Sequence, residues 1–223
     1  MKQRKSLSSI TLGRQSNRQP RNPGLTLRLA GLFILSLALA QPAASAPFPK
    51  KGKAAGNGEM LAQSCFACHG PRGASVASPM PIIGGQNAAY LMDAMMAFKN
   101  TTRPATIMTR LVDAYSEQEI VAMTQYIASQ PYVRAQQTVD GAKVEIGREI
   151  YARACKKCHI DGGRESSESE YPLLAGQWLP YMQMSMADIL AGKRAVDDKF
   201  KAALDKLSKD EIDAVLHFFA AQR

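Results

Sequence analysis

Two short cysteine–histidine motifs contain the residues of this sequence whose types and spacing could do chemistry. Each motif has two cysteines separated by two residues and followed directly by a histidine, as in Cys65-Phe-Ala-Cys68-His69 and Cys155-Lys-Lys-Cys158-His159. This pattern is the attachment signature of a c-type haem, because two thiols at this spacing can add to two vinyl groups on one edge of a porphyrin. The adjacent histidine then lies under the iron as its proximal ligand. Together the motifs use all four cysteines of the chain.

Other uses of paired cysteines fit this chain less well. Zinc sites built from two such pairs usually close a shorter loop, and they would leave the histidine after each pair unexplained. A thioredoxin-like redox pair needs a βαβ setting that the sequence lacks. Disulfides are common in exported proteins, but a bond between cysteines this close together is strained. We therefore predict two covalently attached haem c groups.

The sixth iron ligand decides whether a haem only carries electrons or also binds other molecules. A methionine there saturates the iron and raises its potential. In small helical cytochromes this methionine lies on a loop before the last helix, and Met108 lies in such a segment, eight residues before Ser116. We predict Met108 as the distal ligand of the first haem. Five other methionines are interpreted as packing residues, since methionine fills cores readily: Met80, Met92, Met95, Met96 and Met123.

The second motif has no methionine in the matching place. Counting back eight residues from Ser208, as Met108 stands to Ser116, gives Phe200, and counting from the preceding Gly-Gln segment gives Lys199. A phenylalanine ring cannot ligate iron. Three alternatives stay open: an iron with no sixth protein ligand, a lysine amine that has lost its proton, or a methionine from the preceding helix. The lysine candidates are Lys199 and Lys201, and the methionine candidates are Met184 and Met186.

The two motifs belong to two copies of one unit, repeated after about 91 residues. Three further segments recur, each with the same order relative to its cysteine pair. They are Pro81-Ile-Ile-Gly-Gly-Gln86 with Pro172-Leu-Leu-Ala-Gly-Gln177, Tyr90 with Tyr181, and Ser116-Glu-Gln-Glu119 with Ser208-Lys-Asp-Glu211. The chain is therefore interpreted as a tandem duplication.

Each copy is predicted to be mostly helical, because its apolar residues recur at helical spacing and no alternating run is long enough for a sheet. The two Ser-x-x-Glu segments are capping boxes that begin a helix. Asn87 is predicted to cap a helix that runs to Lys99, and a short helix is expected before each cysteine pair. His217 stands opposite the apolar stripe of the last helix, so we interpret it as an exposed residue rather than a ligand.

The N-terminal segment differs in composition from the rest. Residues 1–46 have a basic start, an apolar run of about a dozen residues and a small-residue end, which together indicate a secretory signal peptide. The apolar run is shorter than the roughly 20 residues of a spanning helix, so no stable membrane anchor is expected. The segment holds seven basic and no acidic residues, so the formal charge of +9 falls to about +2 without it. That charge gives no indication of nucleic-acid binding.

These patterns predict an all-α protein of two tandem cytochrome c domains. We expect a flexible N-terminus at 47–57, a first domain at 58–130, a linker at 131–142 that is rich in turn-forming and polar residues, and a second domain at 143–223. Export through a signal peptide implies a periplasmic location.

Residues 58–223 resemble a known family, the dihaem cytochromes of the cytochrome c4 type. More closely, they resemble the dihaem cytochrome subunit of flavocytochrome c, the sulfide dehydrogenase. The resemblance rests on Cys155-Lys-Lys-Cys-His-Ile-Asp-Gly-Gly163, Glu170-Tyr171, Leu174-Ala-Gly-Gln-Trp-Leu-Pro-Tyr181 and Thr106-Ile-Met-Thr-Arg110 with Tyr115-Ser116. It implies two cytochrome c lobes packed about a pseudo-twofold axis, with their haems close together. The family has a methionine near Lys199 and Phe200, and this chain departs from it there.

The resemblance also implies a partner, a separate FAD-containing flavoprotein that takes electrons from sulfide. Electrons would pass from the flavin to the haems and then to a soluble cytochrome or a similar acceptor. No dinucleotide-binding glycine motif occurs in the sequence, so any flavin is expected on another polypeptide. Two alternatives remain: a free carrier of the cytochrome c4 type that serves a terminal oxidase, and a haem enzyme with an open second iron.

Overall fold

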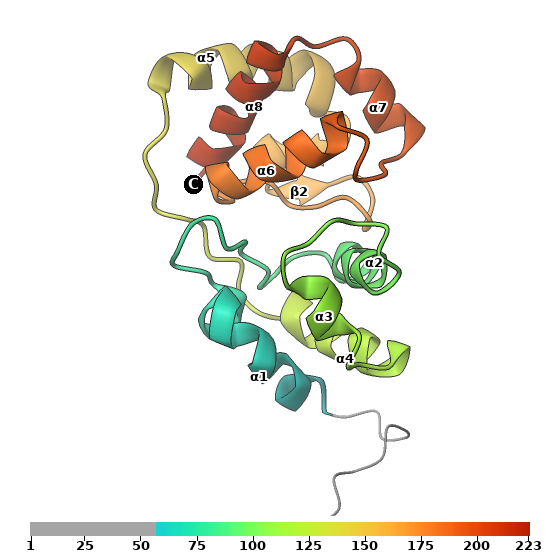
Figure 1. Cartoon of the computed structure of the whole chain (residues 1–223). Helices are drawn as coiled ribbons and strands as arrows, with labels where there is room; N and C mark the ends of the chain where they lie inside the picture. Colours follow the sequence, from blue (N-terminus) through green and yellow to red (C-terminus); the bar gives the residue numbers. More distant parts are fainter. Residues whose placement is uncertain (1–56) are drawn as a thin grey trace, which may run out of the picture. The chain divides into compact units, whose positions relative to one another are not determined.

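The computed structural model describes residues 57–223 of the chain (Figure 1). The predicted signal peptide at 1–46, and all but the last residue of the predicted flexible segment at 47–57, lie outside the described residues. Four helices belong to the first copy, and we call them the first lobe: α1 (Gly58–His69), α2 (Ala88–Lys99), α3 (Met108–Val112) and α4 (Glu117–Ala128). Four helices belong to the second lobe: α5 (Gly141–Ile150), α6 (Leu179–Leu190), α7 (Asp198–Leu204) and α8 (Lys209–Ala221).

Short irregular elements complete the described part. A 3-10 turn follows α1 at Pro71–Gly73, a π-helical turn continues α5 at Tyr151–Cys155, and a second 3-10 turn spans Asp161–Gly163. Two strands of two residues each, β1 (His159–Ile160) and β2 (Glu165–Ser166), pair antiparallel with His159 opposite Ser166. The sequence did not predict this ladder, because two residues cannot show an alternating pattern. The prediction of a mainly helical chain is confirmed.

Both predicted capping boxes are present at the starts of α4 and α8. The Ser116 hydroxyl accepts a hydrogen bond from the Glu119 amide at 3.3 Å, and the Glu119 carboxylate accepts one from the Ser116 amide at 2.8 Å. Ser208 and Glu211 repeat this arrangement at 3.2 and 2.8 Å. The boxes satisfy backbone amides that the first turn of a helix leaves without partners, and so they fix where each last helix begins.

The first and last helices of each lobe cross at a glycine. In the first lobe α1 packs on α4, and in the second α5 packs on α8. A Cβ atom added at Gly58 would lie 2.2 Å from the Ala122 carbonyl oxygen, and one at Gly147 would lie 2.1 Å from the Ala214 carbonyl oxygen. Since such distances are impossible for real atoms, only glycine allows the backbones to come this close.

The π-helical turn explains an irregularity between the copies. Seven positions separate Gly58 from Cys65, whereas eight separate Gly147 from Cys155. A π-helical turn holds one extra residue, and the turn at Tyr151–Cys155 lies within this interval. The extra residue is therefore taken up before the cysteines, and both haem motifs keep the same place relative to the helix crossing.

Each lobe has its own hydrophobic cluster. The buried members in the first lobe are Ala62, Leu91, Met123 and Ile127. In the second lobe they include Ile150, Leu179, Met182, Val215 and Phe219. Met123 is fully buried and Met95 packs against the first cluster, which confirms for these two residues that they serve as packing residues.

The segment between the lobes lies against the second lobe. Helix α5 begins at Gly141, inside the predicted linker, and the linker boundaries stay a prediction. The Ala135 amide donates to the Gly176 carbonyl at 2.8 Å, and the Gln137 side chain donates to the Gln177 carbonyl at 2.8 Å and accepts from the Leu179 amide at 2.8 Å. These bonds hold an extended segment against the start of α6.

The same segment overturns the prediction for His217. This histidine is buried, not exposed, with 8 % of its surface accessible. Its Nδ1 atom accepts a hydrogen bond from the Asp140 amide at 3.1 Å, because the segment before α5 covers the face of α8 that lies opposite the apolar stripe. The equivalent residue of the first lobe, Gln125, is exposed. His217 is a buried structural residue of the second lobe.

Candidate haem sites

The two cysteine–histidine motifs occupy the end of the first helix of each lobe. Cys65, Cys68 and His69 lie in the last turns of α1. Cys155 ends the π-helical turn after α5, and the chain then turns so that His159 begins β1. All four cysteines are free thiols. Each lobe therefore presents two thiols and a histidine at or just after the end of its first helix.

The two histidines of these motifs are buried and held in one orientation. The Nδ1 atom of His69 lies 2.8 Å from the Pro81 carbonyl oxygen, and Nδ1 of His159 lies 3.2 Å from the Pro172 carbonyl oxygen. A carbonyl oxygen can only accept, so Nδ1 carries the proton and Nε2 keeps its lone pair. Burial lowers the pKa of His69, and it lowers the pKa of His159 to about 4. A neutral imidazole with a free Nε2 is the form that binds iron.

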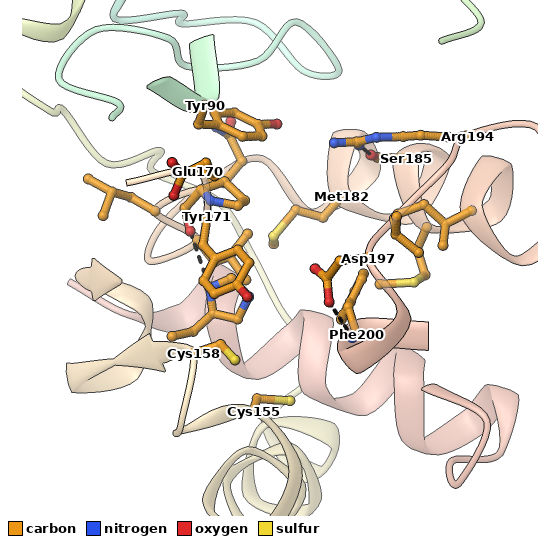
Figure 2. A pocket seen from close by; sticks show the side chains of 18 of the residues that line it. Tyr90, Cys155, Cys158, Glu170, Tyr171, Met182, Ser185, Arg194, Asp197 and Phe200 are labelled. Atoms are coloured by element: carbon orange, nitrogen blue, oxygen red, sulfur yellow. Dashed lines mark hydrogen bonds between the residues drawn. The ribbon is translucent and has the colours of Figure 1, made fainter. Parts of the chain in front are cut away.

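A cavity of about 1100 Å³ extends from the second motif. Figure 2 shows Cys155 and Cys158 at the base of this cavity, Tyr171 on one side, and Asp197 and Phe200 on the opposite side. Much of the wall is apolar and comes from α6, α7 and α8, including Ile189, Leu204, Val215, Leu216 and Phe219. Two thiols, a histidine and an apolar wall fit a flat, largely apolar ring attached at one edge.

The structure makes Phe200 the equivalent of Met108. Helices α3 and α7 both end four residues before a capping serine, and their last residues, Val112 and Leu204, are both buried. With the helix ends aligned in this way, Met108 and Phe200 fall on the same position. Met108 is half-buried at the first position of α3, and Phe200 lines the cavity of the second lobe. Assignment of Met108 as an iron ligand stays a prediction.

The other candidate ligands of the second iron differ in their exposure to solvent and in whether they line the cavity. Lys199 contributes to the cavity wall but is exposed, and Lys201 is exposed and pairs with Asp205 at 3.1 Å. Met184 points to solvent with 56 % of its surface accessible, whereas Met186 lines the cavity. Met182 also lines it, and sequence reasoning missed this residue. Met182 is four residues before Met186, and residues i and i+4 share a helix face. This spacing could have indicated from the sequence that both methionines face the same site.

Two glutamines join the lobes through reciprocal hydrogen bonds. The Gln86 amide group donates to the Leu173 carbonyl at 2.7 Å and accepts from the Leu173 amide at 2.9 Å. Gln177 makes the same pair of bonds with Ile82, at 2.8 and 2.9 Å. Both glutamines are 3 % exposed. Such an exchange between equivalent residues is what a pseudo-twofold interface produces.

Two arginines and two tyrosines gather beside these glutamines, in the wall of the cavity. Arg103 donates to the Tyr181 hydroxyl at 3.0 Å and lies over the Phe98 ring at 4.6 Å. Burial raises the pKa of Tyr90, but the positive charges of Arg103 and Arg194 outweigh it, and the net shift is downward. Within the described residues no carboxylate pairs with either arginine. Arg103 and Arg194 are one repeat period apart, so they hold equivalent positions in the two copies. This equivalence could have indicated the cluster from the sequence.

A further buried donor lies near this cluster. The Tyr132 hydroxyl has no hydrogen-bond partner within the described residues. Burial raises its pKa strongly, and the positive charge of Arg134 opposes that shift. Buried polar atoms normally have partners, and Tyr132 is an exception in this structure. Arg103 and Arg194, in contrast, line the cavity, where their positive charges suit the carboxylates of a haem.

Residues 57–223 contain no group of three or more His, Cys, Asp or Glu side chains that could hold a metal ion. None of the described helices is long and apolar enough to cross a membrane.

The helical lobes and their two attachment motifs define a class, the dihaem c-type cytochromes. A scan of protein-family models gave no match. Cytochrome c4 from Azotobacter vinelandii is 32 % identical over 183 residues, which cover 73 % of this chain and 85 % of that protein. The chain therefore belongs to the cytochrome c4 family, holds two haem c groups and transfers electrons.

Two more relatives bear on this assignment. The cytochrome subunit of sulfide dehydrogenase from Chlorobaculum tepidum is 38 % identical over 72 residues, 32 % of this chain and 64 % of that protein. The crystal structure of reduced recombinant cytochrome c4 from Pseudomonas stutzeri matches 77 % of this chain and all of that chain, with a TM-score of 0.66 and 24 % identity. The structural likeness confirms the predicted fold of two tandem cytochrome c domains.

Proposed function

We propose that this chain is a periplasmic electron-transfer subunit that accepts electrons from an FAD-containing flavoprotein oxidising sulfide and passes them to a soluble cytochrome or a similar acceptor. The observation that carries the proposal is the direct bonding of the two haem lobes through Gln86 and Gln177. Two redox sites joined in this way suit a relay in which one faces a donor and the other an acceptor. The sulfide dehydrogenase subunit of Chlorobaculum tepidum supports the choice of donor.

Four cysteines and two histidines would hold the haems. Cys65 and Cys68 would bind the first haem and Cys155 and Cys158 the second, with His69 and His159 presenting Nε2 to the irons. Each bound haem would supply an iron that accepts and releases one electron at a time. The protein fixes the imidazoles, excludes water with apolar side chains, and offers Arg103 and Arg194 to neutralise carboxylates. The basic, apolar and small-residue pattern of 1–46 supports export.

A second function is favoured by one observation. The match to Azotobacter vinelandii cytochrome c4 extends over 85 % of that protein, whereas the match to the sulfide dehydrogenase subunit covers 64 % of its chain. A free carrier of the cytochrome c4 type, without a permanent flavoprotein partner, would have the same two haem sites. The two functions differ in whether a second polypeptide stays bound.

Purification from the native host distinguishes them. The cytochrome should be isolated at low ionic strength through its haem absorbance, and each copurifying chain should be identified by mass spectrometry. We expect an FAD-containing chain in constant ratio to the cytochrome, and reduction of the haems when sulfide is added to the complex. The opposite result is a cytochrome isolated as a monomer that sulfide reduces only after a separately purified protein is added, or does not reduce at all. That result would establish the free carrier.

A further inference from the structure

We propose that the second haem iron has no distal protein ligand and binds a small neutral diatomic molecule in its ferrous state, whereas Met108 closes the first haem. This is a binding function in addition to electron transfer. It rests on which side chains occupy the distal wall of the second cavity.

The residue in the ligand position is Phe200. Asp197 caps α7 by accepting a hydrogen bond from the Phe200 amide at 2.9 Å, so the start of this helix is fixed and Phe200 lies in its first turn. The buried Leu204 anchors the other end, as Val112 does for Met108 in α3. A benzyl side chain has no lone pair to offer a metal. The second lobe therefore keeps the frame of the distal wall and lacks the ligand.

The lysines of α7 are poor replacements. Lys201 bonds both carboxylate oxygens of Asp205, at 3.1 and 3.3 Å, on the exposed side of the helix. Lys199 contributes to the cavity wall but is exposed to solvent. An ammonium group must lose its proton and its water before it can bind iron, and an exposed position favours neither step.

The methionines of α6 are used in packing. Met182 is 5 % exposed within the hydrophobic cluster of the second lobe, and Met186 packs against that cluster. Their equivalents in the first lobe, Leu91 and Met95, pack in the same way where Met108 is available as ligand. Swinging either sulfur to the iron would open a gap in the core, which is costly. Met184 points to solvent.

The chemistry of the distal wall selects the kind of ligand. Ile189, Val196 and Phe200 line it, and Asp197 adds a carboxylate. Apolar side chains do not stabilise an anion, and in the same cavity the Asp197 carboxylate offsets the positive charges of Lys199 and Arg194. A neutral diatomic molecule such as carbon monoxide or nitric oxide needs no charge compensation, so it fits this wall.

Carbon monoxide is the probe that tests the proposal. The purified dihaem protein is reduced with dithionite and titrated with carbon monoxide, and the bound amount is measured from the absorbance difference spectrum. We expect one carbon monoxide per chain, half of the haem content. No binding, with low-spin spectra for both irons, would refute the proposal, and so would two molecules per chain.

A reciprocal exchange of residues locates the binding. Phe200→Met should supply the missing thioether and lower binding from one carbon monoxide per chain to none. Met108→Phe should open the first haem and raise it to two. Phe200→Leu is the matched control, because it changes the same side chain without adding a ligand, and binding should stay at one. Binding that persists in a folded Phe200→Met protein, judged by unchanged circular dichroism, would overturn the assignment.

Single variants distinguish a displaced ligand from an open site. Lys199→Ala, Met182→Leu and Met186→Leu should each leave the rate of carbon monoxide binding essentially unchanged, because none of these side chains would have to leave the iron at an open site. A tenfold faster rate in one of them would identify that residue as a ligand that carbon monoxide must displace, and would refute the open site. None of these results bears on sulfide-dependent reduction, so the proposed function can stand or fall separately.

Discussion

The ring orientation and the protonation state of His69 and His159 suit these residues to bind iron. In each, a proline carbonyl holds Nδ1 and thereby sets both the tautomer and the direction of the ring. Burial keeps each imidazole neutral by lowering its pKa. Both effects come from backbone and packing, so the two sites are alike on the proximal side although their cysteine pairs enclose different residues. The sequences of the two lobes differ at Met108 and Phe200, the pair of equivalent positions at which a distal ligand is predicted.

Covalent attachment at both motifs gives the first prediction. The intact mass of the purified protein should exceed that of the polypeptide by two haems, and acid–acetone extraction should leave both on the chain, because thioether bonds resist it. Replacing Cys155 and Cys158 together with serine should leave one covalent haem, bound to Cys65 and Cys68. A single haem in the unmodified protein, or haem that extraction removes, would contradict the two-site assignment.

Loss of the Met108 thioether gives the second prediction. Met108→Leu keeps an apolar side chain but removes the sulfur, so the band from methionine-to-iron charge transfer should disappear. The reduction potential of one haem should decrease, because axial ligands tune the potential of haem iron over a range of roughly 0.8 V. Potentiometric titration with absorbance detection measures both. Met184→Leu is the control, since Met184 is exposed on α6, and it should change neither quantity. An unchanged band in Met108→Leu would exclude Met108 as ligand.

At the level of elements, the crossing of the first and last helices sets where each haem motif lies. Gly58 and Gly147 bring the paired helices into backbone contact, and the π-helical turn takes up one extra residue before Cys155. A glycine is costly within a helix, so the presence of Gly147 inside α5 reflects the close contact rather than helix propensity. The cysteines follow within about two turns, and their position depends on this contact.

The crossing in the second lobe gives the third prediction. Gly147→Ala would place a methyl group 2.1 Å from the Ala214 carbonyl oxygen, so the helices must separate. We expect the free energy of unfolding to fall by about 1–3 kcal/mol, the usual cost of overpacking. Gly141→Ala is the control on the same helix, because nothing lies within 4 Å of the added methyl group. It should raise the free energy of unfolding by about 0.5–1 kcal/mol. Urea titration followed by circular dichroism measures both, and equal effects would contradict the role of the crossing.

At the level of the whole molecule, the second copy of the repeat serves both as a redox site and as the binding partner of the first. Gln86 and Gln177 each satisfy one amide and one carbonyl of the opposite lobe. Asn87 and Trp178, the next residues, also bond across the interface, to the Tyr171 and Ser75 carbonyls at 2.7 and 3.3 Å. Polar groups that pair reciprocally therefore join the two lobes, and the interface orders two redox sites in one protein.

The glutamine pairs give the fourth prediction. Gln86→Ala would leave the partly buried amide and carbonyl of Leu173 without partners, and Gln177→Ala would do the same to the buried amide and carbonyl of Ile82. Each should lower the free energy of unfolding by about 1–3 kcal/mol, the cost of leaving buried polar groups unsatisfied. Gln125→Ala, at an exposed position of α4, should stay within about 0.5 kcal/mol. Denaturation of the haem-loaded protein measures the three, and a Gln86→Ala protein as stable as Gln125→Ala would show that the interface does not need these bonds.

The sequence by itself determined the features that local spacing encodes. The repeat, and the lack of a methionine at the position that matches Met108, follow from comparing two segments of the sequence about 91 residues apart. The cysteine–histidine motifs and the capping boxes at Ser116 and Ser208 depend on residues close together in the chain. Their geometry follows from the covalent backbone and from the period of a helix, so they could be recognised without a structure. The comparisons then confirmed the family and the two haem c groups that these features predicted.

The tertiary structure decided what depends on residues far apart in the chain. Asn87 begins α2 but makes no capping bond, because its side-chain amide is turned toward Ser166 and Tyr171 of the other lobe. His217 is buried because a segment some 77 residues away covers its helix face. Met182 rather than Met184 lines the second cavity because core packing fixes how α6 is rotated. Each of these outcomes follows from a competition between contacts across the fold, and no local pattern records which contact prevails.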